Sequence, residues 1–181
     1  MIVISGPSGV GKTTVVRKLC EENRFERVIT ATTRPPRSHE VDGKDYHFLS
    51  RNKFEKGIEE NRFLETATIF GNLYGTPKSS ILDPVLEGKK VVADIDTQGA
   101  RSVRNLDVEA IFFLIAPPSQ EELERRLKGR DTESPESLTR RLDAARHELE
   151  QTDLYDVVVV NETVDRTVNR IGEELKIRSI L

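Results

Sequence analysis

The sequence predicts an α/β fold in which helices cover both faces of a parallel β-sheet. Five short runs rich in apolar residues recur along the chain, at 2–4, 28–33, 90–95, 109–115 and 156–160. Each run is almost continuously apolar rather than alternating, which is typical of strands buried on both faces of a parallel sheet. Segments with helical periodicity lie between these runs, and this alternation of strand and helix indicates the α/β class.

The helical segments are marked by apolar residues that repeat every three or four positions. Three such stripes are present: Val15, Val16, Leu19 and Cys20; Leu138, Leu142, Ala145 and Leu149; and Val164, Val168, Ile171 and Leu175. Residues at this spacing share one face of a helix, so each stripe is expected to pack against the sheet.

Length and composition exclude several classes of protein. The chain has 181 residues, 28 Lys and Arg against 31 Asp and Glu, and a net charge of −3. At about 150 residues per domain this predicts a single domain. The mild acidity disfavours nucleic-acid binding, and no apolar run is long enough to span a membrane. A lone cysteine, Cys20, and an initial apolar stretch that stops at Ser5 favour a cytoplasmic protein without a signal peptide.

Two segments interrupt the alternation of strands and helices. The first, 34–77, begins with Arg-Pro-Pro-Arg and contains extended runs at 44–49 and 63–70 with a helix capped by Ser50 between them. It predicts a small, mostly β insertion at the strand ends, where open α/β folds bind ligands. The second, 121–150, has charges of alternating sign and predicts a helix–loop–helix.

A phosphate-binding motif follows the first strand. Residues 6–13 read G-x-x-x-x-G-K-T, that is Gly6, Pro7, Ser8, Gly9, Val10, Gly11, Lys12 and Thr13, with Thr14 next in the helix. Glycines allow backbone N–H groups to surround phosphate oxygens at the positive end of the following helix. Lys12 is then placed to reach the β- and γ-phosphates, and the Thr13 hydroxyl to join the shell of Mg²⁺. The sequence therefore predicts a nucleoside triphosphate site.

The motif alone does not identify the phosphoryl acceptor, since GTPase switches, ATP-driven motors and small-molecule kinases share it. Arg34 and Arg37 are held apart by two prolines, and two guanidinium groups on a stiff turn suit a phosphate monoester. Tyr46 and Tyr74 could donate hydroxyls to the same phosphate. The alternative is that the arginines are solvated and the tyrosines only pack.

Two carboxylates indicate which nucleobase the chain could bind. Glu65 has apolar neighbours and Asp96 follows the run 90–95. Guanine presents two adjacent donors, N1–H and N2–H₂, whereas adenine offers an acceptor at N1, so a buried carboxylate would select guanine. The alternative for Glu65 is an exposed strand residue in a surface ion pair.

Six segments in order along the whole chain carry a family resemblance. They read TATTRPPR (30–37), EVDGKDYHF (40–48), GNLYGT (71–76), DIDTQG (94–99), IAPPS (115–119) and VVNE (159–162). In these segments the chain resembles guanylate kinases. The resemblance implies a P-loop NTPase-type core at about 1–33, 78–120 and 151–181, a GMP-binding insertion at about 34–77 and a helical lid at about 121–150.

The resemblance also implies the reaction ATP + GMP ⇌ ADP + GDP, with Mg²⁺ as cofactor. It assigns Lys12, Arg130 and Arg141 to catalysis, and Arg126 and Asn161 to ATP together with 6–14. Thr13 would bind Mg²⁺, partly through water. The implied GMP-binding residues are Thr30, Arg34, Arg37, Tyr46, Glu65, Tyr74, Thr76, Asp94 and Asp96.

Two other functions are compatible with such a chain. A scaffold domain of the same fold would bind phosphorylated peptides, but such domains typically lose the phosphate cradle, whereas Lys12 and Thr13 are present here. A related kinase could act on a phosphorylated sugar, but Tyr46, Glu65 and Tyr74 favour a nucleotide.

Overall fold

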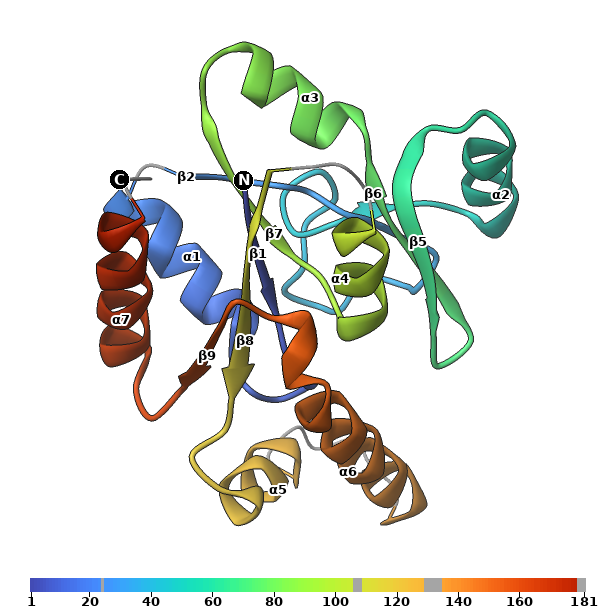
Figure 1. Cartoon of the computed structure of the whole chain (residues 1–181). Helices are drawn as coiled ribbons and strands as arrows, with labels where there is room; N and C mark the ends of the chain where they lie inside the picture. The colour runs from blue at the N-terminus through green and yellow to red at the C-terminus, as the bar shows by residue number, and fades with distance from the viewer. Residues whose placement is uncertain (24, 106–108, 129–134, 179–181) are drawn as a thin grey trace.

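The computed structural model describes residues 1–23, 25–105, 109–128 and 135–178, and in this part of the chain a parallel sheet lies at the centre (Figure 1). Its strand order is β2-β7-β1-β8-β9, and every neighbouring pair is parallel. The strands are β1 (Ile2–Ser5), β2 (Phe25–Arg27), β7 (Lys90–Asp94), β8 (Ile111–Ala116) and β9 (Val157–Val160). The predicted α/β class is therefore confirmed.

Alternate residues of each central strand enter different hydrophobic clusters, because successive side chains point to opposite faces of a sheet. Ile2 and Ile4 pack with α1 (Lys12–Asn23) and α7 (Val164–Ile177), whereas Val3 packs on the other face. The second face is covered by α3 (Ser79–Leu86) and α4 (Thr97–Arg104). Both faces are thus buried, as the continuous apolar runs predict.

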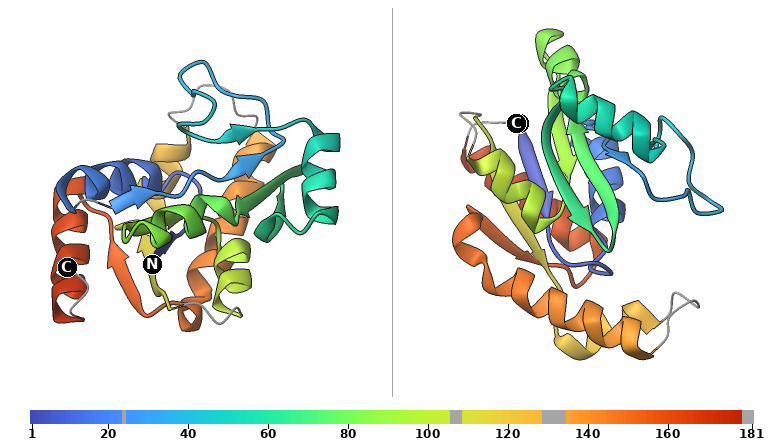
Figure 2. Two further views of the ribbon diagram at one scale, coloured as in Figure 1. Left: turned by 90° about the horizontal axis from the view of Figure 1, so that it is seen from above. Right: turned by 90° about the vertical axis from the view of Figure 1, so that its right-hand side faces the viewer.

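A smaller four-stranded sheet, of order β4-β3-β6-β5, lies beside the first (Figure 2). Its elements are β3 (Ala31–Thr32), β4 (His47–Phe48), α2 (Arg51–Glu59), β5 (Phe63–Ile69) and β6 (Asn72–Pro77). Helix α2 begins after Ser50, whose hydroxyl accepts a hydrogen bond from the Lys53 N–H at 3.4 Å, as expected for its cap. Phe54 of α2 is fully buried and stacks on Phe63, with ring centroids 4.4 Å apart.

The expectation of one continuous strand over 28–33 is wrong. The parallel sheet includes β2, which ends at Arg27, and the next residue, Val28, still donates its N–H to the Val92 carbonyl at 2.8 Å. It then crosses to the second sheet, where β3 pairs with β4 and β6. Val28 and Ala31 are both buried, but in different layers. The extended run expected at 44–49 likewise shortens to β4.

Two helices form a hairpin at the edge of the fold that lies lowest in Figure 1, namely α5 (Gln120–Lys128) and α6 (Pro135–Glu150). Leu123 and Leu127 pack against Ala145 in a hydrophobic cluster of their own. The helix–loop–helix predicted for 121–150 is therefore present, while its loop lies outside the described residues. A 3₁₀ turn, η1 (Thr152–Leu154), leads from α6 to β9.

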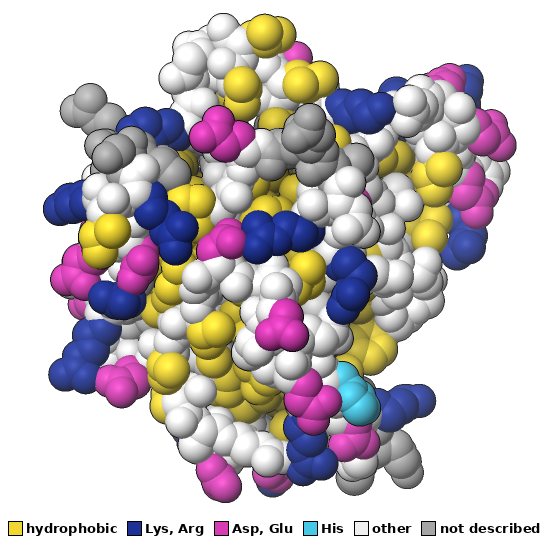
Figure 3. Space-filling model, viewed as in Figure 1, with side chains coloured by type: hydrophobic (Ala, Val, Ile, Leu, Met, Phe, Trp, Pro, Cys, Tyr) yellow, Lys and Arg dark blue, Asp and Glu magenta, His cyan; other side chains and the backbone are white. Residues whose placement is uncertain are grey.

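Charges of both signs are interspersed over the face drawn in Figure 3, in keeping with the balanced composition. Within the ranges that the structure describes, no helix is both long enough and apolar enough to cross a bilayer.

The α7 helix allows a direct test of the core. Leu175 is fully buried against the sheet, whereas Ile177 on the same helix is 74% exposed. Truncating a buried leucine removes transfer energy and leaves a cavity, so Leu175→Ala should lower the free energy of unfolding by about 2–5 kcal/mol. Ile177→Ala should change it by less than about 0.5 kcal/mol. Urea unfolding of the two variants measures both values, and equal losses would contradict the packing described.

Candidate active site

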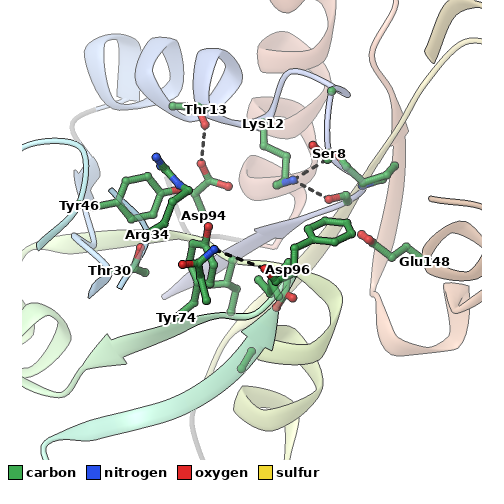
Figure 4. A pocket seen from close by; sticks show the side chains of 18 of the residues that line it. Ser8, Lys12, Thr13, Thr30, Arg34, Tyr46, Tyr74, Asp94, Asp96 and Glu148 are labelled. Carbon is green, nitrogen blue, oxygen red and sulfur yellow. Dashed lines mark hydrogen bonds between the residues drawn. The ribbon is translucent and has the colours of Figure 1, made fainter. Parts of the chain in front are cut away.

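The predicted ligand-binding residues converge on the edge of the parallel sheet where β1 and β7 end. Ile4 of β1 is paired with Asp94 of β7, so the loop after β1 and the residues after β7 leave the sheet side by side. A cavity of about 690 Å³ opens there. Its walls combine the phosphate-binding motif with residues of the second sheet (Figure 4).

The glycine-rich loop has a backbone that other residues could not adopt. Gly6 has φ +142°, and a Cβ there would lie 2.3 Å from the Ile115 carbonyl oxygen. Gly11 has φ +97°, and α1 begins at the next residue. The Lys12 ammonium donates hydrogen bonds to the carbonyls of Gly6 at 2.6 Å and Pro7 at 3.2 Å. The loop is therefore shaped as a phosphate cradle, with its lysine folded over it.

The loop is joined to the end of β7 by a hydrogen bond from the Thr13 hydroxyl to the Asp94 carboxylate, at 3.0 Å. The Asp94 side chain is 5% exposed. A hydroxyl and a carboxylate are oxygen ligands of the kind that Mg²⁺ prefers. No group of three or more His, Cys, Asp or Glu residues in the described ranges is arranged to hold a metal. These two residues therefore fit a Mg²⁺ ion that completes its shell with phosphate oxygens and water.

The second sheet brings the predicted phosphate-binding residues Arg34, Arg37, Tyr46 and Tyr74 to the opposite wall of the cavity. The Arg34 guanidinium lies 5.5 Å from the centroid of the Tyr46 ring, which meets Tyr74 edge-on at 6.2 Å. The Arg34 side chain is 17% exposed and that of Arg37 is 50% exposed. Arg34 is thus built into the wall, whereas Arg37 is at its rim.

Glu40 contacts both arginines, and this role was not predicted from the sequence. Its carboxylate accepts two hydrogen bonds from Arg34, both at 2.9 Å, and one from the Arg37 backbone N–H at 2.7 Å. Although burial opposes ionisation, these hydrogen bonds hold the pKa of Glu40 below its ordinary value. Glu40 therefore holds the Arg34 side chain and the backbone of Arg37 together.

The Tyr46 hydroxyl is a donor at neutral pH. Burial, assisted by the negative charge of Asp94, raises the pKa of Tyr46 to about 12. The phenol therefore stays protonated and can donate a hydrogen bond to an anionic ligand.

Glu65 is a buried carboxyl and not a surface residue, with 8% of its surface exposed. The Thr76 hydroxyl, opposite it on β6, donates a hydrogen bond to Glu65 Oε1 at 2.6 Å. Asp96 caps α4 by accepting from the Gly99 N–H at 2.7 Å, and Gly99 also packs against the Glu65 carboxyl. Burial raises the pKa of Glu65 to about 7.

Glu65 and Asp96 line the cavity together with Thr30. Burial also raises the pKa of Asp96. The polar end of this wall thus offers two carboxyl groups and a hydroxyl, which suits a ligand edge rich in hydrogen-bond donors.

The remaining predicted site residues do not all line the cavity. Arg141 lines the cavity, with its guanidinium 5.8 Å from the ring centroid of Phe70. Arg126 and Asn161 do not line it, since both donate hydrogen bonds to the carbonyl of the buried Val10, at 3.2 and 2.7 Å, and so lie behind the phosphate loop. Arg130 lies outside the described residues.

Two further cavity residues were missed from the sequence. Arg140 was given no role from the sequence, yet it lines the cavity. Glu148 also lines it and accepts a hydrogen bond from the Thr97 hydroxyl at 3.3 Å, and burial raises its pKa. Arg141 and Glu148 are seven residues apart, two turns of one helix, and this spacing was the available signal.

The sequence matches the profile of one known family, guanylate kinase, over residues 1–177. The chain belongs to the guanylate kinase family. The guanylate kinase of Clostridium tetani is 46% identical over 94% of this chain and 82% of its own length. That of Caldanaerobacter subterraneus subsp. tengcongensis is 47% identical over 94% of this chain and 84% of its own.

A solved structure agrees with these relatives. The crystal structure of guanylate kinase from Anaplasma phagocytophilum superposes with a TM-score of 0.82 at 33% identity, over all of this chain and 86% of the other. The family that the sequence segments indicated is therefore confirmed, and with it the P-loop kinase fold.

The buried Glu65 should give this guanylate kinase fold a characteristic pH dependence of stability. Glu65 has an ordinary pKa of 4.5 and a folded-state pKa of about 7, so between these values only the folded protein holds the proton. Its contribution to stability is present below pH 4.5 and is lost as the pH rises through 7. At about 1.4 kcal/mol per pH unit, the loss amounts to about 3 kcal/mol.

The neutral variant Glu65→Gln should not lose this contribution. Its free energy of unfolding, relative to that of the parent protein, should therefore rise by up to about 3 kcal/mol between pH 4.5 and pH 8. Denaturant unfolding at the two pH values measures the difference. A difference that stays constant with pH would show that Glu65 is ionised normally in the folded protein.

Proposed function

We propose that this protein is a guanylate kinase that transfers the γ-phosphoryl group of ATP to GMP, giving ADP and GDP. One observation carries the proposal. A single cavity has the phosphate loop on one wall and, on the other, the arginine–tyrosine cluster and Glu65, which is held from behind by the buried Thr76. Membership of the guanylate kinase family supports the same activity.

The two ends of the cavity suit the two ends of GMP. Arg34, Arg37, Tyr46 and Tyr74 would bind its phosphate, because guanidinium and phenol groups donate to phosphate oxygens. Glu65 and Asp96 would accept from guanine N1–H and N2–H₂, with Thr30 and Thr76 framing the base. Thr76 would act through Glu65, because its hydroxyl donates a 2.6 Å hydrogen bond that orients the Glu65 carboxylate.

ATP would bind on the phosphate loop, with residues 6–14 around its phosphates and Lys12 on the β- and γ-phosphates. We propose that Arg126 and Asn161 border the adenine, since both are anchored beside the loop at Val10. Arg141, together with Arg130, would approach the transferring phosphoryl group from α6 and the loop before it.

Thr13 and Asp94 would hold Mg²⁺, partly through water. Bound there, Mg²⁺ would supply positive charge that offsets the negative charge of the ATP phosphates. The residues of the chain contribute position and charge: Lys12 orients the donor phosphates, and Arg34 and Arg37 hold the acceptor oxygen in line with them. Such a transfer needs no covalent intermediate with the protein.

The division of the chain is part of the proposal. The insertion at about 34–77 would carry GMP, and the lid at about 121–150 would close over ATP, with the rest as a fixed core. The separate hydrophobic cluster of α5 and α6 supports movement of that hairpin as a unit. Closure would exclude the water that could otherwise hydrolyse ATP. A cytoplasmic location is proposed from the single cysteine alone.

An acceptor panel tests the function. ADP release from MgATP should require an added nucleoside monophosphate and be much faster with GMP than with AMP, CMP or UMP. Lys12→Ala should lower kcat by about a hundredfold or more, because a charge on the transferring phosphate is lost, while GMP binding remains measurable. Lys18→Ala, on the outer part of the same helix where Lys18 pairs with Glu22 and Asp165, should be neutral.

The outcomes separate the alternatives. A scaffold domain would release no ADP in response to any acceptor. A sugar kinase would ignore all four nucleotides and respond to a sugar phosphate. Full turnover by Lys12→Ala would refute the placement of the donor phosphates.

GMP binding should depend on the ionisation of Glu65. Only the carboxylate can accept from both guanine donors, and the free protein holds this proton up to about pH 7. The KM for GMP should therefore rise about tenfold for each pH unit below 7, and level off above it. Glu65→Gln should raise this KM by about tenfold or more at pH 8, narrow the preference for GMP over AMP, and remove the pH dependence. An unchanged preference would exclude Glu65 from the base site.

A further inference from the structure

Arg27 is a buried cation with no role in the phosphate cradle or in the acceptor wall, the side of the cavity formed by Arg34, Arg37, Tyr46 and Tyr74. It is the last residue of β2, and its side chain is 16% exposed. Among buried side-chain nitrogen and oxygen atoms in the described ranges, its Nε is the one without a hydrogen-bond partner. Burying an incompletely bonded guanidinium is costly, so its retention here calls for a reason.

Two carboxylates lie on either side of the Arg27 guanidinium. Nη2 is 3.8 Å from Asp94 Oδ2, and Nη1 is 4.0 Å from Asp45 Oδ1. Both distances exceed that of a charge-assisted hydrogen bond, which is about 2.7–2.9 Å. The guanidinium is therefore held between two anions and closely bonded to neither.

Asp94 lines the cavity, whereas Asp45 does not line it but is next to Tyr46, which does. Asp94 accepts the Thr13 hydroxyl beside the phosphate loop. Asp45 immediately precedes Tyr46 in the acceptor wall, and its other oxygen accepts from the Val41 N–H at 2.9 Å.

We propose that Arg27 is a positioning residue that couples the acceptor wall to the Asp94 carboxylate. A movement of the second sheet by about 1 Å toward the core would bring Asp45 to hydrogen-bond distance of Arg27, whose other carboxylate neighbour, Asp94, lies on the adjacent strand β7. Binding of GMP would supply that movement, and Arg27 would then fix the Tyr46 segment and Asp94 in one arrangement. This inference rests on the proposed function, since it assumes that GMP is the ligand of the acceptor wall.

Calorimetric titration with GMP alone, without ATP or Mg²⁺, is the test. Arg27→Met keeps the apolar stem and removes the charge, and should weaken GMP binding by about tenfold. Asp45→Asn should weaken it similarly, because it removes the other end of the link while keeping an oxygen for the Val41 N–H. The double variant should be no weaker than either single variant, and Arg27→Lys should recover part of the affinity. Arg51→Met, an exposed arginine on α2, is the control.

Each outcome supports or overturns the inference. Losses that multiply in the double variant, or an Arg27→Met protein with lower thermal stability but unchanged GMP affinity, would reduce Arg27 to a packing residue. If Arg27→Met does not fold, Asp45→Asn still decides, since unaltered binding by that variant overturns the link. Absence of GMP binding by the parent protein would instead refute the proposed function.

Discussion

The parallel pairing of β1 with β7 is the constraint on which the site depends. Its register places Ile4 opposite Asp94, so the phosphate loop and the acidic segment after β7 begin at the same level of the sheet. Thr13 can therefore reach Asp94, and the cap at Asp96 can face Glu65 across Gly99. A shift of one residue in this pairing would turn Asp94 toward the opposite face of the sheet and separate the two halves of the cavity.

Two of the cationic side chains that line the cavity are hydrogen-bonded within the protein. Lys12 is bonded to carbonyls of its own loop, and Arg34 to Glu40. In the proposed site, a phosphate would therefore exchange hydrogen bonds with these partners, and the net gain in free energy from each new hydrogen bond would be modest. Fixed donors are what phosphoryl transfer requires, because its catalysis consists almost entirely of position and charge.

How much could be predicted from the sequence depended on whether the signal was local. The loop 6–13 is contiguous, and its chemistry is evident without the fold; the stripes of α1 and α7 are local too. The run 28–33 misled because apolar continuity reports burial and not which sheet buries it, and Val28 and Ala31 lie in different ones. Glu148 escaped notice because its partner Thr97 is 51 residues away and only the fold brings the two together. The partners of Glu40, Arg34 and Arg37, are near in sequence, but nothing in the residue pattern shows that the loop folds back so that Glu40 meets them.

In the proposed site, the selection of guanine would follow from whether Glu65 carries a proton. The pKa of the buried Glu65 carboxyl is raised to about 7, so near neutral pH its ionised form is only weakly favoured unless a ligand stabilises it. Guanine does so with two donors, whereas adenine presents a lone pair at N1 to a carboxylate that already accepts from Thr76. A protonated Glu65 reverses this relation, since its O–H can donate to adenine N1. In the proposed site, specificity would therefore depend on the ionised carboxylate more than on the shape of the pocket, and the Thr76 hydroxyl, which favours that ionised form, would take part in recognition of the base.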